Sequence, residues 1–192
     1  MACDNCVIVA TLRSISVYCG ASSGGNPEFA RAARETGRLI AASKRTLVYG
    51  GGGIGLMGEL ARAAMAEGGR VIGVIPGHLN TAERAYHEVE LRVVDTMHER
   101  KQLIADLAEG FIALPGGLGT FDELFEILTW NQIGLHGKPV GLLNVAGYFD
   151  PFLGVIEHAV REGFAPARAR SRILVSETPA GLLDLLDAHI DP

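Results

Sequence analysis

The residues best suited to chemistry lie in one stretch, where a short apolar run at 111–114 leads into glycines and then a helical pattern. The sequence Pro115-Gly-Gly-Leu-Gly-Thr120 holds three glycines, which let the backbone approach a ligand closely. We expect Thr120 to cap the helix that follows, so that its side chain and the first free N–H groups point at one spot. Such a helix start attracts an anion through its dipole and its unpaired donors. The stretch therefore predicts a phosphate-binding loop.

Glu123 places a carboxylate about one helical turn beyond this predicted phosphate site. At helical spacing it shares one side of the helix with Ile127 and Trp130. The other side carries an apolar stripe made of Phe121, Leu124, Phe125 and Leu128. A helix that is apolar on two sides is expected to be buried on two sides, and a second subunit is one candidate cover. The pattern leaves two roles open for Glu123, a catalytic carboxylate or a charge that merely favours the helix dipole.

The predicted helix from Met97 to Leu107 carries an arginine among its apolar positions. Arg100 lies three residues after Met97 and four before Ile104, so it falls on the stripe that faces the core. A guanidinium in that position needs a charged or hydrogen-bonding partner, unless it extends past the end of the stripe to water. We favour a functional role for Arg100, because the start of this helix faces the carboxyl ends of the predicted strands.

A second glycine-rich loop follows the predicted strand 46–49 and opens a helix. Gly50, Gly52 and Gly55 satisfy the G-x-G-x-x-G pattern of dinucleotide sites in the right strand-to-helix context. That kind of site also needs an acid near the end of the next strand, and the segment at 70–78 has none there. The loop therefore favours close backbone approach to a smaller nucleotide, with Gly52 and Gly53 as candidate binding residues.

Strands alternate with helices along the chain, which predicts an α/β fold. We expect strands at 14–19, 46–49, 70–75, 90–94, 111–114, 139–143 and 173–176. This order is typical of a single-domain, doubly wound (Rossmann-like), mostly parallel sheet of about seven strands with helices on both faces. The expected organisation is an N-terminal tail at 1–13 and one nucleotide-binding domain at 14–192. Ligands of such folds bind at the carboxyl ends of the strands, where the glycine loops lie.

The composition excludes several classes of protein. With 192 residues, 48% hydrophobic and 20% charged, the chain is long and apolar enough for one folded domain. A net charge of −5 argues against a nucleic-acid surface, and no run approaches the ~18 apolar residues of a membrane span. No secretory signal is evident, and Cys3, Cys6 and Cys19 form neither a disulfide framework nor a paired zinc motif. We expect a cytoplasmic protein without a bound metal.

The same motifs resemble those of a known family. The segment Pro115–Glu123 matches the P-G-G-x-G-T-x-x-E signature of the LONELY GUY (LOG) family of cytokinin riboside 5′-monophosphate phosphoribohydrolases, and Met97–Lys101 matches its second motif. Tyr49–Gly58 and Trp130–Pro139 are also similar to the family, so the resemblance runs from about Ser14 to the C-terminus. Members are often labelled "lysine decarboxylase". Such an enzyme would hold pyridoxal phosphate on a lysine, but this chain has only three lysines and nothing in its sequence suggests a pyridoxal-phosphate fold.

The resemblance implies hydrolysis of the N-glycosidic bond of a nucleoside 5′-monophosphate, which releases the free base and ribose 5-phosphate without a cofactor. It implies that Arg100 and Glu123 are the catalytic pair and that Lys101 assists substrate binding. The residues implied to hold the phosphate and the rest of the substrate are Gly116, Gly117, Gly119, Thr120, Asp122 and, as a further contact, Glu83. It also implies a homodimer whose active sites lie near the subunit junction. From composition alone, we expect neither a nucleic-acid nor a membrane partner.

Two functions follow from these residues. Breaking a glycosidic bond to ribose passes through an oxocarbenium-like state. Glu123 could stabilise this cation or activate the water that attacks it. Arg100 could then offset charge on the departing purine or orient the substrate. The alternative is a non-catalytic nucleotide or cofactor carrier, since molybdenum-cofactor carrier proteins share this fold and its glycine loops. The Arg100–Glu123 pair separates the two hypotheses, because a carrier would not need it.

Overall fold

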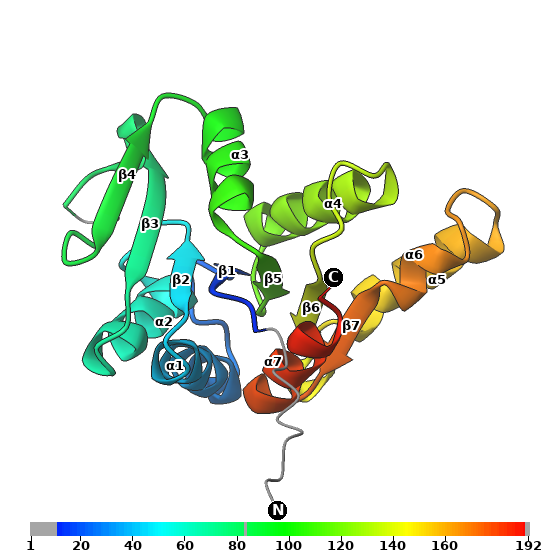
Figure 1. The fold of residues 1–192 in the computed structure, drawn as a ribbon, viewed down its shortest axis with the longest axis horizontal. Coiled ribbons are helices and arrows are strands. Elements are labelled where there is room, and N and C mark those ends of the chain that lie inside the picture. The colour runs from blue at the N-terminus through cyan, green and yellow to red at the C-terminus, as the bar shows by residue number, and fades with distance from the viewer. Residues whose placement is uncertain (1–10, 83, 191–192) are drawn as a thin grey trace, which may run out of the picture.

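The computed structural model describes residues 11–82 and 84–190, which form one seven-stranded sheet (Figure 1). All strand pairings are parallel, in the order β4-β3-β2-β1-β5-β6-β7. The strands are β1 (Ser14–Tyr18), β2 (Thr46–Tyr49), β3 (Val71–Pro76), β4 (Glu90–Val94), β5 (Gly110–Ala113), β6 (Val140–Leu143) and β7 (Ile173–Ser176). The predicted doubly wound α/β fold is confirmed.

Helices cover both faces of the sheet (Figure 1). One face packs against α1 (Pro27–Ala42), α2 (Gly55–Ala66) and α7 (Pro179–Ala188). The other packs against α3 (Met97–Leu107), α4 (Leu118–Gln132) and α5 (Asp150–Arg161). Three short elements were not expected from the sequence: the 3₁₀ turns η1 (Gly77–Leu79) and η2 (Val145–Gly147), and the helix α6 (Arg168–Ser171).

Alternating side chains of β1 fill both layers of the core. Ile15 and Val17 point into the layer under α1 and α2, whereas Tyr18 points into the layer under α3 and α4. The folded part begins slightly before the expected boundary at residue 14, because Leu12 is buried and its N–H donates to Asp187 Oδ1 (3.2 Å). The Cys3–Cys6 motif lies outside the described residues. Within them, no helix combines the length and the apolar character needed to cross a membrane.

The strand order reverses at β1, which pairs with β2 on one side and β5 on the other. A doubly wound sheet opens a crevice at the carboxyl edge of such a switch point. The loops there are tied to one another, since Gly20 N–H donates to Pro115 O (3.1 Å) and Met57 N–H donates to Gly20 O (3.3 Å). The two glycine-rich loops found in the sequence therefore meet the loop after β1 at one edge.

Candidate active site

The helix α4, which follows the predicted phosphate-binding loop, begins about one turn earlier than the sequence suggested. Gly117 is the N-cap of α4, the helix begins at Leu118, and no side chain caps it. Thr120 therefore lies inside the first turn, and the prediction that it caps the helix is wrong. Its side chain is buried against Gly116, where an added Cβ would overlap the threonine hydroxyl. The first N–H groups of α4 have no intrahelical acceptor, so they remain donors for a ligand.

Arg100 and Glu123 form a buried ion pair between α3 and α4. Arg100 Nη1 lies 2.5 Å from Glu123 Oε1, and each residue is only 9% exposed. Arg100 Nε also donates to Val74 O at the end of β3 (3.0 Å). A Cβ at Gly50 would overlap the guanidinium, so the glycine after β2 makes room for it. The predicted core-facing arginine thus has both a charged partner and a backbone acceptor.

Burial raises the pKa of the Glu123 carboxyl above its ordinary value of 4.5. The charge and the hydrogen bond of Arg100 act in the opposite direction but do not cancel the effect of burial. With one carboxylate oxygen bonded to Arg100, the other is left for a substrate or a water molecule. Such a shifted, partly desolvated carboxylate in a cavity is typical of catalytic sites.

A cavity of about 450 Å³ is lined by this pair and by the glycine-rich loop that the sequence predicts to bind phosphate. Of the residues predicted from the sequence, those lining it are Arg100, Gly116, Gly117, Gly119, Thr120, Asp122 and Glu123. Sequence reasoning missed several apolar and aromatic side chains that also line it: Phe29, Leu56, Met57, Leu79, Met97 and Tyr148. Gly50, Ser22 and Ser23 line it as well, and their place in glycine-rich loops after strands was the signal for them.

Other predicted site residues lie outside the cavity lining. Lys101 pairs instead with Asp122 (3.2 Å) and Glu126 (3.0 Å), and thus holds a residue that does line the cavity. Gly52 and Gly53 face the loop at 84–85, where Gly53 N–H donates to Arg84 O (2.7 Å). Glu83 lies outside the described residues.

The two apolar sides of α4 pack against other helices of the same chain, although Phe125 stays 43% exposed. Ile127 is 2% exposed and packs in the core cluster that includes Ile104 of α3, so the expectation that it faces a partner is wrong. On the other side, the rings of Phe121 and Phe125 pack against Phe152 of α5, at centroid distances of 5.9 and 5.1 Å. The sequence pattern could not distinguish a neighbouring helix from a second subunit.

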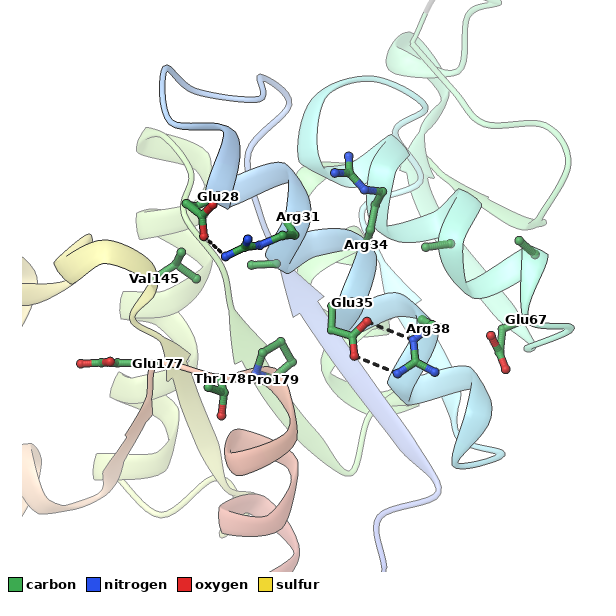
Figure 2. Close-up of a pocket in the computed structure, with 13 residues that line it drawn as sticks. Glu28, Arg31, Arg34, Glu35, Arg38, Glu67, Val145, Glu177, Thr178 and Pro179 are labelled. Carbon is green, nitrogen blue, oxygen red and sulfur yellow. Dashed lines mark hydrogen bonds and ion pairs between the residues drawn. The ribbon is translucent and has the colours of Figure 1, made fainter.

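A larger hollow of about 610 Å³ lies between α1, α2 and the start of α7 (Figure 2). Two exposed ion pairs on α1, Arg31 with Glu28 and Arg38 with Glu35, lie along it (Figure 2), and Arg34 pairs with Glu59 of α2. Exposed pairs of this kind are screened by water and have little reactivity of their own. We therefore place the candidate active site in the smaller cavity.

The fold and the site define the class of protein: a doubly wound α/β domain with a candidate phosphate site beside a buried arginine–glutamate pair. A family profile described as "Possible lysine decarboxylase" matches residues 57–186. A cytokinin riboside 5′-monophosphate phosphoribohydrolase of Rhodococcoides fascians is 49% identical over 175 residues, covering 90% of this chain and 88% of the relative. The rice enzyme LOG, from Oryza sativa subsp. japonica, is 48% identical over 179 residues, covering 93% and 74%.

The chain therefore belongs to the LOG family of cytokinin riboside 5′-monophosphate phosphoribohydrolases, which confirms the resemblance found in its motifs. The older family label does not fit the site, because the three lysines, Lys44, Lys101 and Lys138, are absent from the cavity lining.

Solved structures share the fold at lower identity. The molybdenum cofactor binding protein of Rippkaea orientalis has a TM-score of 0.69 and 23% identity, covering 93% of this chain and 97% of that one. The molybdenum cofactor carrier protein of Chlamydomonas reinhardtii has a TM-score of 0.68 and 24% identity, covering 91% and 96%. These likenesses show the fold alone.

Proposed function

We propose that this protein hydrolyses the N-glycosidic bond of an adenosine 5′-monophosphate, with or without an N6 substituent, to the free base and ribose 5-phosphate. The observation that carries the proposal is the buried Arg100–Glu123 pair, which shares one cavity with the free N-terminus of α4. The names of the relatives at 48–49% identity support the same reaction. The reaction adds water across the C1′–N bond, so it needs no oxidant, reductant or second substrate.

The phosphate of the substrate would bind at the start of α4, where the backbone donors of residues 118–120 are free for an anion. Thr120 adds a side-chain hydroxyl at the same place, and Gly116, Gly117 and Gly119 leave room for the phosphate oxygens. Glu123 follows Thr120 by three residues, so it lies one helical turn deeper along the same face. The ribose would then lie between its phosphate and the carboxylate.

Glu123 would act on the ribose as its C1′–N bond breaks. Positive charge then builds on C1′ and the ring oxygen, and a fixed carboxylate stabilises that charge more strongly in a partly desolvated cavity than in water. The same carboxylate accepts a proton from the water that attacks C1′. Its raised pKa suits this second role, because a stronger base takes the proton more readily.

Arg100 would hold Glu123 ionised and in place until the substrate binds. The guanidinium is fixed at two points, by Glu123 and by Val74 O, so it keeps its orientation when the carboxylate engages the substrate. It also lines the cavity, where it can offset negative charge on the departing base.

The apolar side chains of the cavity support a substrate with a hydrophobic N6 group. Met57, Leu79 and Met97 line the same cavity as the catalytic pair, and burial of a prenyl group against such side chains stabilises it by about 25 cal/mol per Å². Comparing kcat/KM for AMP and N6-isopentenyl-AMP decides the preference. A higher value for the prenylated nucleotide is the expected result, and a higher value for AMP would define a plain AMP nucleosidase.

Incubation of the pure protein with each nucleotide, followed by chromatography for free base, tests the activity itself. The proposal expects adenine from AMP and N6-isopentenyladenine from the prenylated nucleotide. Binding of both nucleotides without release of base would instead support the carrier hypothesis.

The protein is further proposed to be a homodimer that works in the cytoplasm. Trp130 lines a groove with Val94 of β4 and Leu103 of α3, together with the polar side chains His98, Glu99, Gln102, Asp106 and Glu126. Trp130→Glu places a charge in that groove and should shift the protein to monomers in sedimentation velocity. Phe164→Glu, at an 89% exposed aromatic beyond α5, is the matched control and should leave the dimer intact. A wild-type monomer with full activity would remove the claim.

A further inference from the structure

The carbonyl groups of the phosphate loop all bond to donors from the protein. Pro115 O accepts from Gly20 N–H (3.1 Å), and Gly117 O accepts from Phe121 N–H (3.1 Å) as the first bond of α4. Gly116 O accepts from the hydroxyl of Tyr148. Carbonyl oxygens repel an anion, so engaging them elsewhere leaves the N–H side of the loop for phosphate. Of the three carbonyls, that of Gly116 depends on a side chain.

The Tyr148 hydroxyl is the side-chain donor that holds the Gly116 carbonyl; Gly116 packs closely against Thr120, whereas the space beside Gly117 is open. A trans peptide is planar, so the carbonyl of Gly116 and the N–H of Gly117 point in opposite directions. Glycines flank this peptide on both sides, and a Cβ at Gly117 would meet nothing within 4 Å. The Tyr148 hydroxyl therefore decides which way the peptide faces. Without it, rotation could turn the Gly116 carbonyl toward the phosphate.

The Tyr148 ring is itself held from three elements. It stacks on Phe121 of α4 with an interplanar angle of 6° and a centroid distance of 6.4 Å. It meets Phe29 of α1 edge-on at 5.4 Å and Phe149 edge-on at 5.2 Å. Offset-stacked and edge-on pairs are the favoured arrangements of aromatic rings. The hydroxyl is therefore delivered to Gly116 by a ring that has little freedom to turn.

The turn before Tyr148 has a conformation that needs support from its surroundings. Ala146 and Gly147 both have positive φ, 52° and 71°, and for alanine this is an unfavourable region. Asn144 holds the turn, since its Nδ2 donates to Asp150 Oδ1 (2.7 Å) and its Oδ1 accepts from Phe149 N–H (2.7 Å). Strained turns that the structure holds firmly occur often at functional sites.

We propose that Tyr148 is a positioning residue for the substrate phosphate, and this rests on the proposed function. Its hydroxyl holds the Gly116–Gly117 peptide in the orientation that presents an N–H, and not a carbonyl, to the anion. Tyr148 acts through the loop and not on the reacting atoms. Its loss should therefore weaken substrate and transition state equally, which raises KM and leaves kcat unchanged.

The test is Tyr148→Phe, which removes one hydroxyl and keeps the ring between Phe29 and Phe121. KM for AMP and the Kd of ribose 5-phosphate, a phosphate-bearing product that does not turn over, should each rise roughly 3- to 10-fold. The kcat should stay within about twofold of wild type, as expected when uniform binding is lost. The matched control is Tyr86→Phe, which removes a hydroxyl bonded to Glu88 (2.9 Å) away from the cavity.

Three results would overturn the proposal: an unchanged Kd for ribose 5-phosphate, a fall in kcat at unchanged KM, or the same loss in Tyr86→Phe. The binding measurement keeps the two proposals apart. If the wild type released no base, the proposed activity would be refuted. The role of Tyr148 would still be decided by a separate quantity, the ratio of the Kd for ribose 5-phosphate in Tyr148→Phe to that in wild type.

Discussion

Replacing Glu123 with glutamine removes the charge from the centre of the site while keeping the size of the side chain. The glutamine oxygen remains an acceptor for Arg100 Nη1, and the Nε bond of Arg100 to Val74 O (3.0 Å) does not depend on Glu123. Glutamine has nearly the same volume as glutamate, so the substitution creates no cavity at this buried position, although the Arg100 guanidinium loses its counter-charge. We therefore expect the variant to fold and to bind AMP.

The two roles left open by the sequence predict different magnitudes. If Glu123 only favoured the helix dipole, its charge would contribute about 0.3–1 kcal/mol to stability and turnover would change little. As a base or cation stabiliser, its loss should lower kcat by ~10²-fold or more, which corresponds to about 2.7 kcal/mol in activation free energy. The free energy of unfolding should fall by up to about 3–5 kcal/mol, because the buried Arg100 guanidinium loses its counter-charge, although the glutamine oxygen still accepts its hydrogen bond.

The assay is steady-state release of adenine from AMP, with thermal unfolding measured on the same samples. Glu126→Gln is the matched control, since Glu126 lies one turn further along α4, pairs with Lys101 (3.0 Å) and is absent from the cavity lining. We expect that control to keep nearly all of its kcat. A Glu123→Gln variant that turns over AMP at close to the wild-type rate would refute the catalytic role, whatever the family motif suggests.

The remaining predictions concern the support of the site and of α4. Gly50→Ala should lower kcat on the order of 10²-fold, because the added methyl overlaps the Arg100 guanidinium, whereas Gly154→Ala meets no atom within 4 Å and should leave kcat unchanged. The kcat of the wild type should fall as pH drops through the Glu123 pKa, which burial raises above 4.5, and a residual rate in Glu123→Gln should lack that acid limb. Burial lowers the pKa of His136, so below about pH 6.5 the unfolded state binds a proton there more readily than the native state does, and the stabilising contribution of the neutral His136 is lost. The difference in free energy of unfolding between wild type and His136→Gln, measured in urea, should therefore narrow between about pH 7 and pH 5. A constant difference would contradict this.

The layout of the fold could be predicted because its signals are local. Apolar runs next to glycine or proline marked most strands, though not β4 or β7, and α1 and α3 follow residues that are typical N-caps, Asn26 and Thr96. The start of α4 was placed wrongly because Gly117, and not Thr120, is its N-cap. A glycine has no side chain to accept a capping hydrogen bond, so the sequence carried no capping signal at that position. Ile127 is covered by α3, and the sequence could not predict this cover, because the periodicity of one helix does not show which helix packs against it.

The candidate site was predictable where motif and chemistry coincide. Arg100 stood out because a charged residue fell on an apolar stripe, and the structure supplies Glu123 and Val74 O as its partners. Tyr148 left no such signal, since a tyrosine after a strand is ordinary and its contact with Gly116 spans 32 positions. Lys101 carries a motif position but pairs across to Asp122 and Glu126 of α4, so its expected role in substrate binding stays a prediction.

The most direct test of the account is the product balance of one reaction. Wild-type protein and N6-isopentenyl-AMP are incubated to partial conversion, and free base, ribose 5-phosphate, nucleoside and inorganic phosphate are all quantified. Hydrolysis at the glycosidic bond predicts base and ribose 5-phosphate in equal amounts, with no nucleoside or inorganic phosphate above the level of a Glu123→Gln sample. Nucleoside with inorganic phosphate, or a bound nucleotide that stays intact, would contradict the proposal that this cavity cleaves the bond between base and ribose.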